Sequence, residues 1–260
     1  MVVKEVRGLA AKDFKSAFIK NLNQSPDQHV LLFIHGYNNS FEDSARRTAQ
    51  IAWDLPFTGQ AGFFSWPSSG KTPDYLADEA KARSAYPALA EFLTMILDGT
   101  GVKQLHLIAH SMGNLVLTLS VNALKRGPQV ALLDLVHQIT LAAPDIDQEE
   151  FRKTILPEFQ TIGARRTIYA SDHDSALGWS AVLRRQRKRL GQTGAEIFLD
   201  TSVDTVEASN IPTENSHGYM FQDLVLLSDI FYLITRNLSP AERRLRRVSK
   251  SALFYWLFPK

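Results

Sequence analysis

Apolar and polar positions alternate along the chain in blocks of two kinds. Short, nearly unbroken apolar runs predict buried strands, and longer stretches with apolar residues every three or four positions predict helices. The predicted strands lie near 29–35, 61–66, 104–110, 137–143, 166–170 and 203–208. The predicted helices lie at about 41–55, 74–98, 112–126, 147–158 and 221–236. This alternation is typical of an α/β protein with a mostly parallel, twisted sheet and helices on both of its faces.

The last segment, residues 239–260, predicts a C-terminal basic and apolar helix. Ser239-Pro240-Ala241-Glu242 is a capping box with proline at the first helical position. The following residues would place an apolar stripe on one side and basic side chains on the others: Ala241, Leu245, Val248, Ala252 and Arg243, Arg244, Arg246, Arg247, Lys250. Such a helix would either pack on the body of the protein or dock on an anionic membrane or an acidic partner.

Length and composition predict one domain, residues 1–260. The chain has 260 residues, 45% of them hydrophobic, which is enough for one sizeable core, and no linker rich in Pro, Gly or Ser divides it. Only about 22 residues separate the strand near 137–143 from the next one, room for one helix and its connections, so no large cap domain is expected.

Several kinds of chemistry are excluded or disfavoured. The chain contains no cysteine, so it has no thiol nucleophile and no disulfide. No metal-binding motif occurs, and no metal or cofactor is expected. The pI near 8.8 comes without a nucleic-acid reader motif, so no nucleic-acid partner is expected. Met1–Gly8 lacks the apolar core of a signal peptide, which favours a cytoplasmic protein, although an exported protein whose signal has been removed would look the same. The oligomeric state is left open.

Candidate chemistry centres on Ala109-His110-Ser111-Met112-Gly113, which joins a predicted strand to a predicted helix. A serine at such a sharp turn is a nucleophile elbow, and small residues two positions before and after it let the backbone pass closely. Ala109 stands where glycine is more usual, which is a mild departure. Ser111 is therefore the candidate nucleophile.

A second strand ends at His35-Gly36-Tyr37, before a helix that Ser40 would open. Acyl transfer places negative charge on a carbonyl oxygen, which two converging backbone N–H groups can stabilise. We expect the backbone N–H groups of Tyr37 and Met112 to provide this oxyanion hole. His35 is interpreted as a structural side chain hydrogen-bonded beneath the loop.

The base and the acid should follow the serine along the chain. His217 is the only late histidine outside the expected acid loop, so it is the candidate base. Asp174, four residues past the strand near 166–170, is the first candidate acid, Asp172 the second and Asp145 the third. The alternative role of Asp145 is a helix cap.

These motifs together resemble a bacterial α/β-hydrolase family catalogued as a domain of unknown function. The resemblance is carried by Phe33–Asn38, Phe64–Ser68, Leu107–Gly113, Leu141–Asp145, Asp174–Leu177 and Ser216–Tyr219, in that order, and covers roughly Val30 to Leu226. It implies the α/β-hydrolase fold and a Ser-Asp-His hydrolase, and it implies no substrate.

The expected function is a serine hydrolase that forms an acyl-enzyme, most simply a carboxylesterase or lipase-like esterase acting on small-molecule esters of short to medium acyl chains. Trp66 and Tyr75 are candidates for the pocket wall. A thioesterase or an acyltransferase would use the same residues. A catalytically idle α/β-hydrolase that serves as an interaction module is the alternative from another class.

Overall fold

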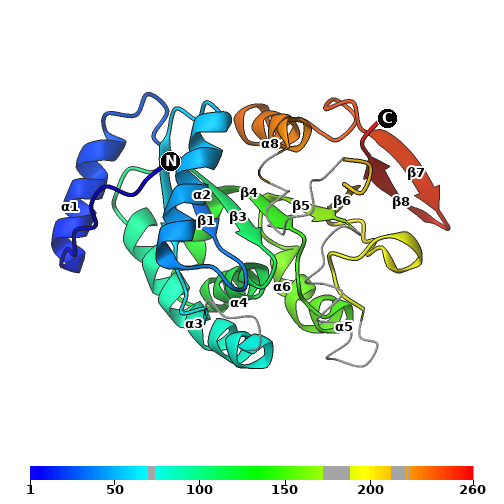
Figure 1. The fold of residues 1–260 in the computed structure, drawn as a ribbon, viewed down its shortest axis with the longest axis horizontal. Helices are drawn as coiled ribbons and strands as arrows, with labels where there is room; N and C mark the ends of the chain where they lie inside the picture. The colour runs from blue at the N-terminus through cyan, green and yellow to red at the C-terminus, as the bar shows by residue number, and fades with distance from the viewer. Residues whose placement is uncertain (70–73, 172–187, 212–220, 222, 260) are drawn as a thin grey trace.

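A computed structural model describes residues 1–69, 74–171, 188–211, 221 and 223–259 (Figure 1). Within these residues, eight strands form one sheet in the order β2-β1-β3-β4-β5-β6-β8-β7. Their bounds are β1 His29–Ile34, β2 Gln60–Phe64, β3 Gln104–His110, β4 Val136–Ala142, β5 Arg165–Ala170, β6 Asp204–Glu207, β7 Arg246–Lys250 and β8 Leu253–Leu257. Neighbouring strands are parallel except for β7 and β8, which are antiparallel.

Helices cover both faces of the sheet (Figure 1). α2 (Phe41–Asp54) and α8 (Leu224–Arg236) contribute buried residues to the core on one face. The core on the other face includes residues of α1 (Ala11–Leu22), α3 (Tyr75–Leu97), α4 (Gly113–Arg126) and α6 (Leu156–Phe159). Short helical segments complete the described part of the chain: η2 Val130–Leu135, α5 Gln148–Glu150, η3 Phe151–Ile155 and η4 Gly194–Glu196.

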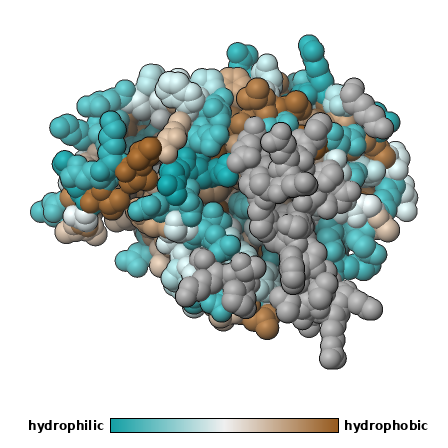
Figure 2. Space-filling model, viewed as in Figure 1, coloured by the Kyte–Doolittle hydropathy of each residue, from teal (hydrophilic) through white to brown (hydrophobic). Residues whose placement is uncertain are grey.

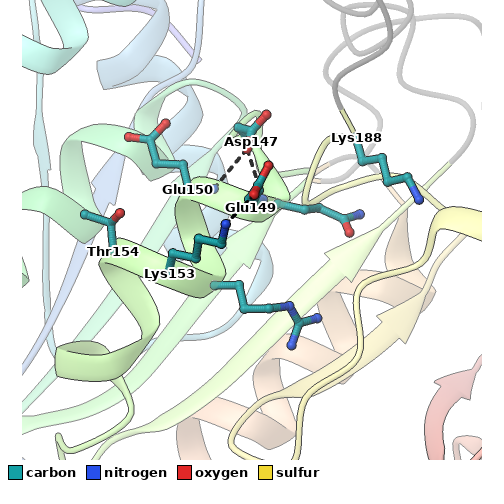
Figure 3. Close-up of a pocket in the computed structure, with 8 residues that line it drawn as sticks. Asp147, Glu149, Glu150, Lys153, Thr154 and Lys188 are labelled. Carbon is teal, nitrogen blue, oxygen red and sulfur yellow. Dashed lines mark hydrogen bonds and ion pairs between the residues drawn. The ribbon is translucent and has the colours of Figure 1, made fainter.

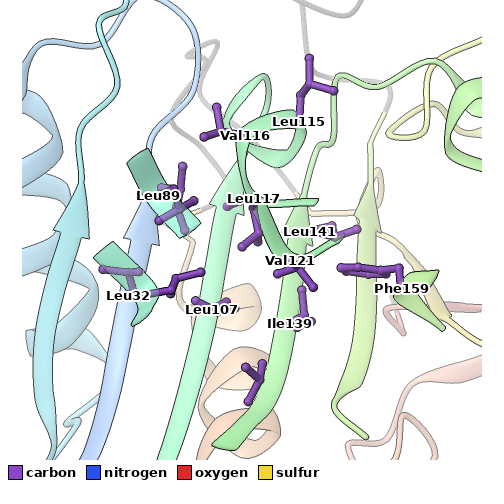
Figure 4. Packing of buried hydrophobic residues seen from close by; sticks show 14 of the residues in the cluster. Leu32, Leu89, Leu107, Leu115, Val116, Leu117, Val121, Ile139, Leu141 and Phe159 are labelled. Atoms are coloured by element: carbon purple, nitrogen blue, oxygen red, sulfur yellow. The ribbon is translucent and has the colours of Figure 1, made fainter. Parts of the chain in front are cut away.

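The alternation of side chains along β1 divides this core in two. Val30, Leu32 and Ile34 enter the cluster under α3 and α4, whereas Leu31 and Phe33 enter the cluster under α2 and α8. Figure 4 shows the first cluster, where strand residues such as Leu107 and Ile139 pack against leucines and valines of α4. A strand buried on both faces has to be apolar throughout, which is why β1 appears in the sequence as an unbroken apolar run.

The six strands expected from the sequence are confirmed within two residues, and the mostly parallel α/β sheet is confirmed with them. Helices also lie where they were expected, although the stretch 147–158 divides into α5, η3 and α6. α3 runs through Pro87 as one helix. α1 was not anticipated. Its Phe14 ring lies 5.8 Å from that of Phe92 on α3, so it packs beside the body of the protein.

The expected C-terminal helix over 239–260 is wrong. The capping box does form, with the Ser239 N–H donating to Glu242 Oε2 at 2.7 Å, but the chain turns away at Arg244, whose φ is +66°. The hairpin β7–β8 follows, with Val206 of β6 paired to Trp256 of β8. The helical spacing of apolar residues in this segment did not decide its structure. The open edge of β6 provides backbone hydrogen bonds to it, and its bulky and aromatic residues favour strands.

Among the residues that the structure describes, we find no helix with the length and hydrophobicity of a membrane span. The same residues contain no cluster of His, Asp or Glu side chains arranged to hold a metal ion. Large hydrophobic side chains are exposed on α8, at Leu224, Val225 and Tyr232, and Figure 2 shows hydrophobic surface where this helix lies.

Candidate active site

Ser111 lies between the end of β3 and the start of α4 in a left-handed backbone conformation, with a φ of +49°. A non-glycine residue in this region is strained by about 1–3 kcal/mol and needs support from its surroundings. That support comes from β4 and the loop after it. The Ser111 N–H donates to Ala142 O at 2.9 Å, and Ser111 O accepts from the Asp145 N–H at 3.2 Å. The amide of Asn114 also donates to Ser111 O, at 2.9 Å. The strained elbow is therefore held from two sides.

Two glycines allow the loop after β1 to touch this elbow. A Cβ atom at Gly113 would lie 2.2 Å from His35 O, and one at Gly36 would lie 2.9 Å from Ser111 Cβ. Real Cβ atoms do not approach other heavy atoms so closely, so any side chain at these positions would push the loop and the elbow apart. The glycine two residues after the serine is thus required by this contact.

His35 is buried beneath the loop, as its interpretation as a structural side chain requires. Its Nε2 accepts from the Trp66 N–H at 3.1 Å, which places the proton on Nδ1, and Nδ1 donates to Gly36 O at 2.8 Å. The ring also stacks on the indole of Trp66, whose Nε1–H donates to His35 O at 2.8 Å. Burial lowers the pKa of His35, and the imidazole stays neutral as these bonds need. The histidine therefore fixes the shape of the loop.

A second set of hydrogen bonds supports the loop from α3. The Asn38 N–H donates to Ser68 Oγ at 2.9 Å, and Ser68 Oγ donates to the buried carboxylate of Asp78 at 2.6 Å. Asn38 has a φ of +58°, and the side-chain amide of Asn39 donates to Tyr37 O at 2.8 Å. Sequence analysis did not find the role of Asp78. Its partner Ser68 lies about ten residues earlier in the chain, and a polar residue within a helical pattern is normally assigned to the exposed face of the helix.

A cavity of about 170 Å³ opens above the elbow. It is lined by Phe33, Gly36, Tyr37, Asn38, Asn39, Arg47, His110, Ser111 and Phe221. The structure thus brings Ser111 and Tyr37, two of the expected site residues, to the same cavity. Met112 follows Ser111 directly at the N-terminal end of α4, and its side chain is buried.

The two candidates for the pocket wall lie elsewhere. Trp66 is 2% exposed and stacks on His35 beneath the loop. Tyr75 is also buried, and its hydroxyl donates to Asp145 Oδ2 at 2.5 Å. Neither lines the cavity above Ser111. Among the lining residues that sequence analysis missed is Arg47, because a basic residue on an amphipathic helix normally belongs to its solvated face.

Asp145 is part of a buried polar cluster. Its Oδ1 pairs with Arg189 Nε at 3.1 Å, and Arg189 also donates to the Tyr75 hydroxyl at 3.1 Å. Both side chains of the ion pair are at most 2% exposed. The carboxylate therefore links the end of β4 to the segment after residue 188 and to α3.

The remaining candidates of the expected triad, Asp174, Asp172 and His217, lie outside the described residues. Their roles as acid and base stay predictions. The described residues show only the strands that precede these candidates. β5 ends at Ala170 and β6 ends at Glu207, and the two strands are parallel neighbours in the sheet. Carboxyl ends of parallel strands lie along the same edge as the end of β3, where Ser111 is found.

A larger cavity, about 730 Å³, lies beside α5 and η3 (Figure 3). Several of its charged side chains have partners: Asp147 accepts from the backbone N–H groups of Glu149 and Glu150 at the start of α5, and Lys153 pairs with Glu149 at 2.5 Å. Lys188 pairs with Glu196, also at 2.5 Å. The described residues that line it include no serine or histidine, whereas the smaller cavity contains Ser111 and is the better candidate for chemistry.

Known proteins resemble the chain at the levels of structure and sequence. A lipase-esterase related protein from Clostridium acetobutylicum superposes with a TM-score of 0.46 at 11% identity, covering 82% of this chain and 96% of the other. The α/β-hydrolase domain-containing protein 10 from mouse gives a TM-score of 0.45 at 14% identity, covering 80% and 90%.

An uncharacterized protein from a Nostoc strain is 23% identical over 245 residues, which cover 71% of this chain. The matched part is 62% of that curated relative, so the chain spans less than two thirds of its length. A family model described as "Alpha/beta hydrolase of unknown function (DUF900)" matches residues 10–206, which include the sheet up to β6 and the whole elbow. The chain therefore belongs to this α/β-hydrolase family.

Proposed function

We propose that this protein is a serine hydrolase that cleaves small-molecule esters through an acyl-enzyme on Ser111. One observation carries the proposal: Ser111 has a φ of +49° at the junction of β3 and α4 and lines a cavity shared with the loop after β1. A protein keeps such strain where the exact placement of one side chain is useful, and a nucleophilic serine is the common case.

In the proposed reaction, Ser111 Oγ bonds to the ester carbonyl carbon and its proton passes to His217. The carbonyl oxygen becomes an oxyanion and accepts hydrogen bonds from the N–H groups of Tyr37 and Met112. The bond to the alcohol oxygen then breaks, and the alcohol leaves with the proton from His217. A water molecule gives a proton to the same imidazole and attacks the acyl carbon. The bond between the acyl carbon and Ser111 Oγ then breaks, the acid leaves, and the proton passes from His217 to Oγ, which restores Ser111.

The third member of the triad is Asp174 in this proposal, with Asp172 as its alternative. Asp145 ranks after them because its carboxylate already has a structural role, binding Arg189 and the Tyr75 hydroxyl. The acid of a triad accepts from the imidazole N–H and holds the ring in position.

The size of the cavity favours short acyl groups. Its volume of about 170 Å³ is well below the roughly 300–1,000 Å³ of pockets that enclose drug-sized ligands. We therefore expect p-nitrophenyl esters of short to medium chains to be hydrolysed best. A rate that peaks at long acyl chains would contradict this part of the proposal.

Labelling with a fluorophosphonate probe tests the nucleophile. The wild-type protein should be labelled and Ser111→Ala should not, because only an activated serine attacks the probe. Ser120→Ala is a matched control: it removes another buried α4 hydroxyl, which donates to Val116 O at 2.7 Å and does not line the cavity. The control should be labelled as strongly as wild type.

Ester hydrolysis by the same three proteins separates an enzyme from an idle interaction module. Ser111→Ala should lose most of the rate and keep a residual catalysis on the order of 10³–10⁴-fold over water from binding and the oxyanion hole. Full hydrolysis by Ser111→Ala would remove Ser111 from the mechanism. A wild-type protein that is neither labelled nor active would support the interaction module.

A further inference from the structure

Among the residues that the structure describes, Arg47 is a cation without an ion-pair partner in the wall of the cavity that contains Ser111. It lies on α2, is half-buried, and lines the cavity together with Asn38 and Asn39. Its Nη1 is shielded from solvent and has no hydrogen-bond partner. None of the described residues lining this cavity is acidic. The described wall of the cavity therefore offers the guanidinium no counter-charge, which a partly buried arginine normally has.

The nearest acidic neighbour on the same helix is already engaged. Asp43 accepts from Ser40 Oγ at 2.6 Å, in the capping box that begins α2, and pairs with Arg46 at 2.6 Å. These hydrogen bonds lower the pKa of Asp43 to about 2, with the bond from Ser40 as the largest cause. Burial lowers the pKa of Arg47, and the charge of Asp43 opposes this effect without a hydrogen bond to the guanidinium. Arginine nevertheless stays protonated in proteins, so the positive charge persists.

A buried charge without a partner is costly, and an unpaired guanidinium presents several N–H groups in a planar fork that matches the oxygens of a carboxylate or a phosphate. We propose that Arg47 binds an anionic oxygen group of the substrate, so that the protein acts on esters carrying a carboxylate or phosphate a few atoms from the scissile bond. The proposal rests on the proposed ester hydrolysis at Ser111. Ser111 and Arg47 line the same small cavity, so the scissile bond and the anionic group of the substrate must lie only a few atoms apart.

Two esters with acyl chains of four carbons test this substrate class. p-Nitrophenyl hydrogen succinate carries a terminal carboxylate, and p-nitrophenyl butyrate is its neutral counterpart. Wild type should show the higher kcat/KM on the succinate ester. In Arg47→Gln the ratio of the two kcat/KM values should fall by about tenfold to a hundredfold, the usual effect of losing hydrogen bonds to a charged group. Arg47→Lys keeps the positive charge but lacks the planar set of N–H groups, so it should retain part of the preference for the succinate ester.

Arg126→Gln is the matched control. It removes the same charge from an exposed pair with Glu158 at the other end of α4, away from the cavity, and the ratio should not change. Inhibition of butyrate hydrolysis by succinate and by inorganic phosphate distinguishes the two anion sources, because the group that Arg47 prefers should compete at lower concentration.

A binding measurement separates failure of this inference from failure of the proposed reaction. In Ser111→Ala, succinate or phosphate should raise the melting temperature, and the shift should disappear in Ser111→Ala/Arg47→Gln. If neither ester is hydrolysed but this pattern is seen, the reaction is wrong and the anion site stands. If the esters are hydrolysed with a ratio that Arg47→Gln leaves unchanged, or if no shift depends on Arg47, the inference is overturned.

Discussion

Ser111 and its neighbours show how much a single position depends on its contacts. Alanine at position 109 is compatible with the elbow, whereas Gly113 has no room for a Cβ atom because His35 O would lie 2.2 Å away. The two small residues that flank the serine are thus not equivalent. The contact with the loop after β1 determines which of them has to be glycine.

The environments of Asp145 and Asp174 lead to the first residue-scale prediction. Asp145→Asn should mainly lower the free energy of unfolding, by about 3–5 kcal/mol, because it breaks a buried ion pair with Arg189. Asp174→Asn should mainly lower kcat with little change in stability, because its proposed role is to orient His217. Urea unfolding and ester hydrolysis measured on both variants check this.

Asp172→Asn serves as the comparison for position. It should affect kcat less than Asp174→Asn does. If instead Asp145→Asn unfolds like wild type but loses turnover, the acid is Asp145 and the ion pair with Arg189 belongs to the site.

At the scale of elements, a second buried cluster joins three parts of the chain that are distant in sequence. Tyr169 of β5 donates to Asp229 of α8 at 2.5 Å, and Arg243, from the turn before β7, binds the same carboxylate. All three side chains are buried. The cluster therefore fastens α8 and the C-terminal hairpin to the sheet.

This cluster gives the element-scale prediction. Arg243→Met should destabilise the protein by about 3–5 kcal/mol in urea unfolding, because it leaves Asp229 as an uncompensated buried charge. The double variant Arg243→Met/Asp229→Leu should recover much of this loss, since apolar groups can replace a buried ion pair. Arg126→Met, in an exposed pair, is the control and should cost at most about 1 kcal/mol. A double variant no more stable than Arg243→Met would argue against an ionic role.

Because the C-terminal segment forms a hairpin and not the expected helix, its basic side chains lie on a strand. Arg246 and Arg247 lie on an exposed strand, and the guanidinium of Arg247 lies 3.8 Å from the centre of the Phe254 ring. Docking on an anionic membrane or an acidic partner stays a prediction. It would have to use this hairpin, and co-sedimentation with anionic vesicles at low and high salt tests it.

For the whole molecule, buried histidines predict sensitivity to acid. His106 lies on β3 with no exposed surface, and neither ring nitrogen has a hydrogen-bond partner. Burial, followed by the charges of His29 and His137, lowers its pKa to about 3. The unfolded chain takes up a proton near pH 6.5, which the folded protein resists. Stability from this group is therefore complete above pH 6.5 and falls as the pH drops toward 3, by up to about 1.4 kcal/mol per pH unit.

His106→Phe removes this titration and keeps an aromatic ring beside Phe57 and His29. Between pH 7 and pH 5 the loss of unfolding free energy should be smaller than in wild type by up to about 2 kcal/mol. Phe57→Leu is the control, because it should lower stability equally at both pH values. An unchanged pH dependence in His106→Phe would show that this histidine is not the acid-sensitive group.

The sequence by itself determined the six central strands, the helices between them and the elbow. The strands were predictable because a strand covered on both faces must be apolar throughout, as in β1, and the elbow because small residues and a serine between a strand and a helix form a local pattern. The position of the loop after β1 followed in the same way from His35 and Gly36. These features depend on residues that are near one another in the chain.

Tertiary structure alone decided the rest. Residues 239–260 have a helical period, yet they form β7 and β8 because the edge of β6 offers hydrogen bonds to them. Asp145 became an ion-pair partner only because Arg189 comes back to it from 44 positions further along the chain. In the sequence Arg47 resembles any solvated helix residue. Only the cavity, and the pairing of Asp43 with Arg46, show that the described residues give it no ion pair. Pairing across long sequence distances depends on the whole packed chain, so no local pattern records it.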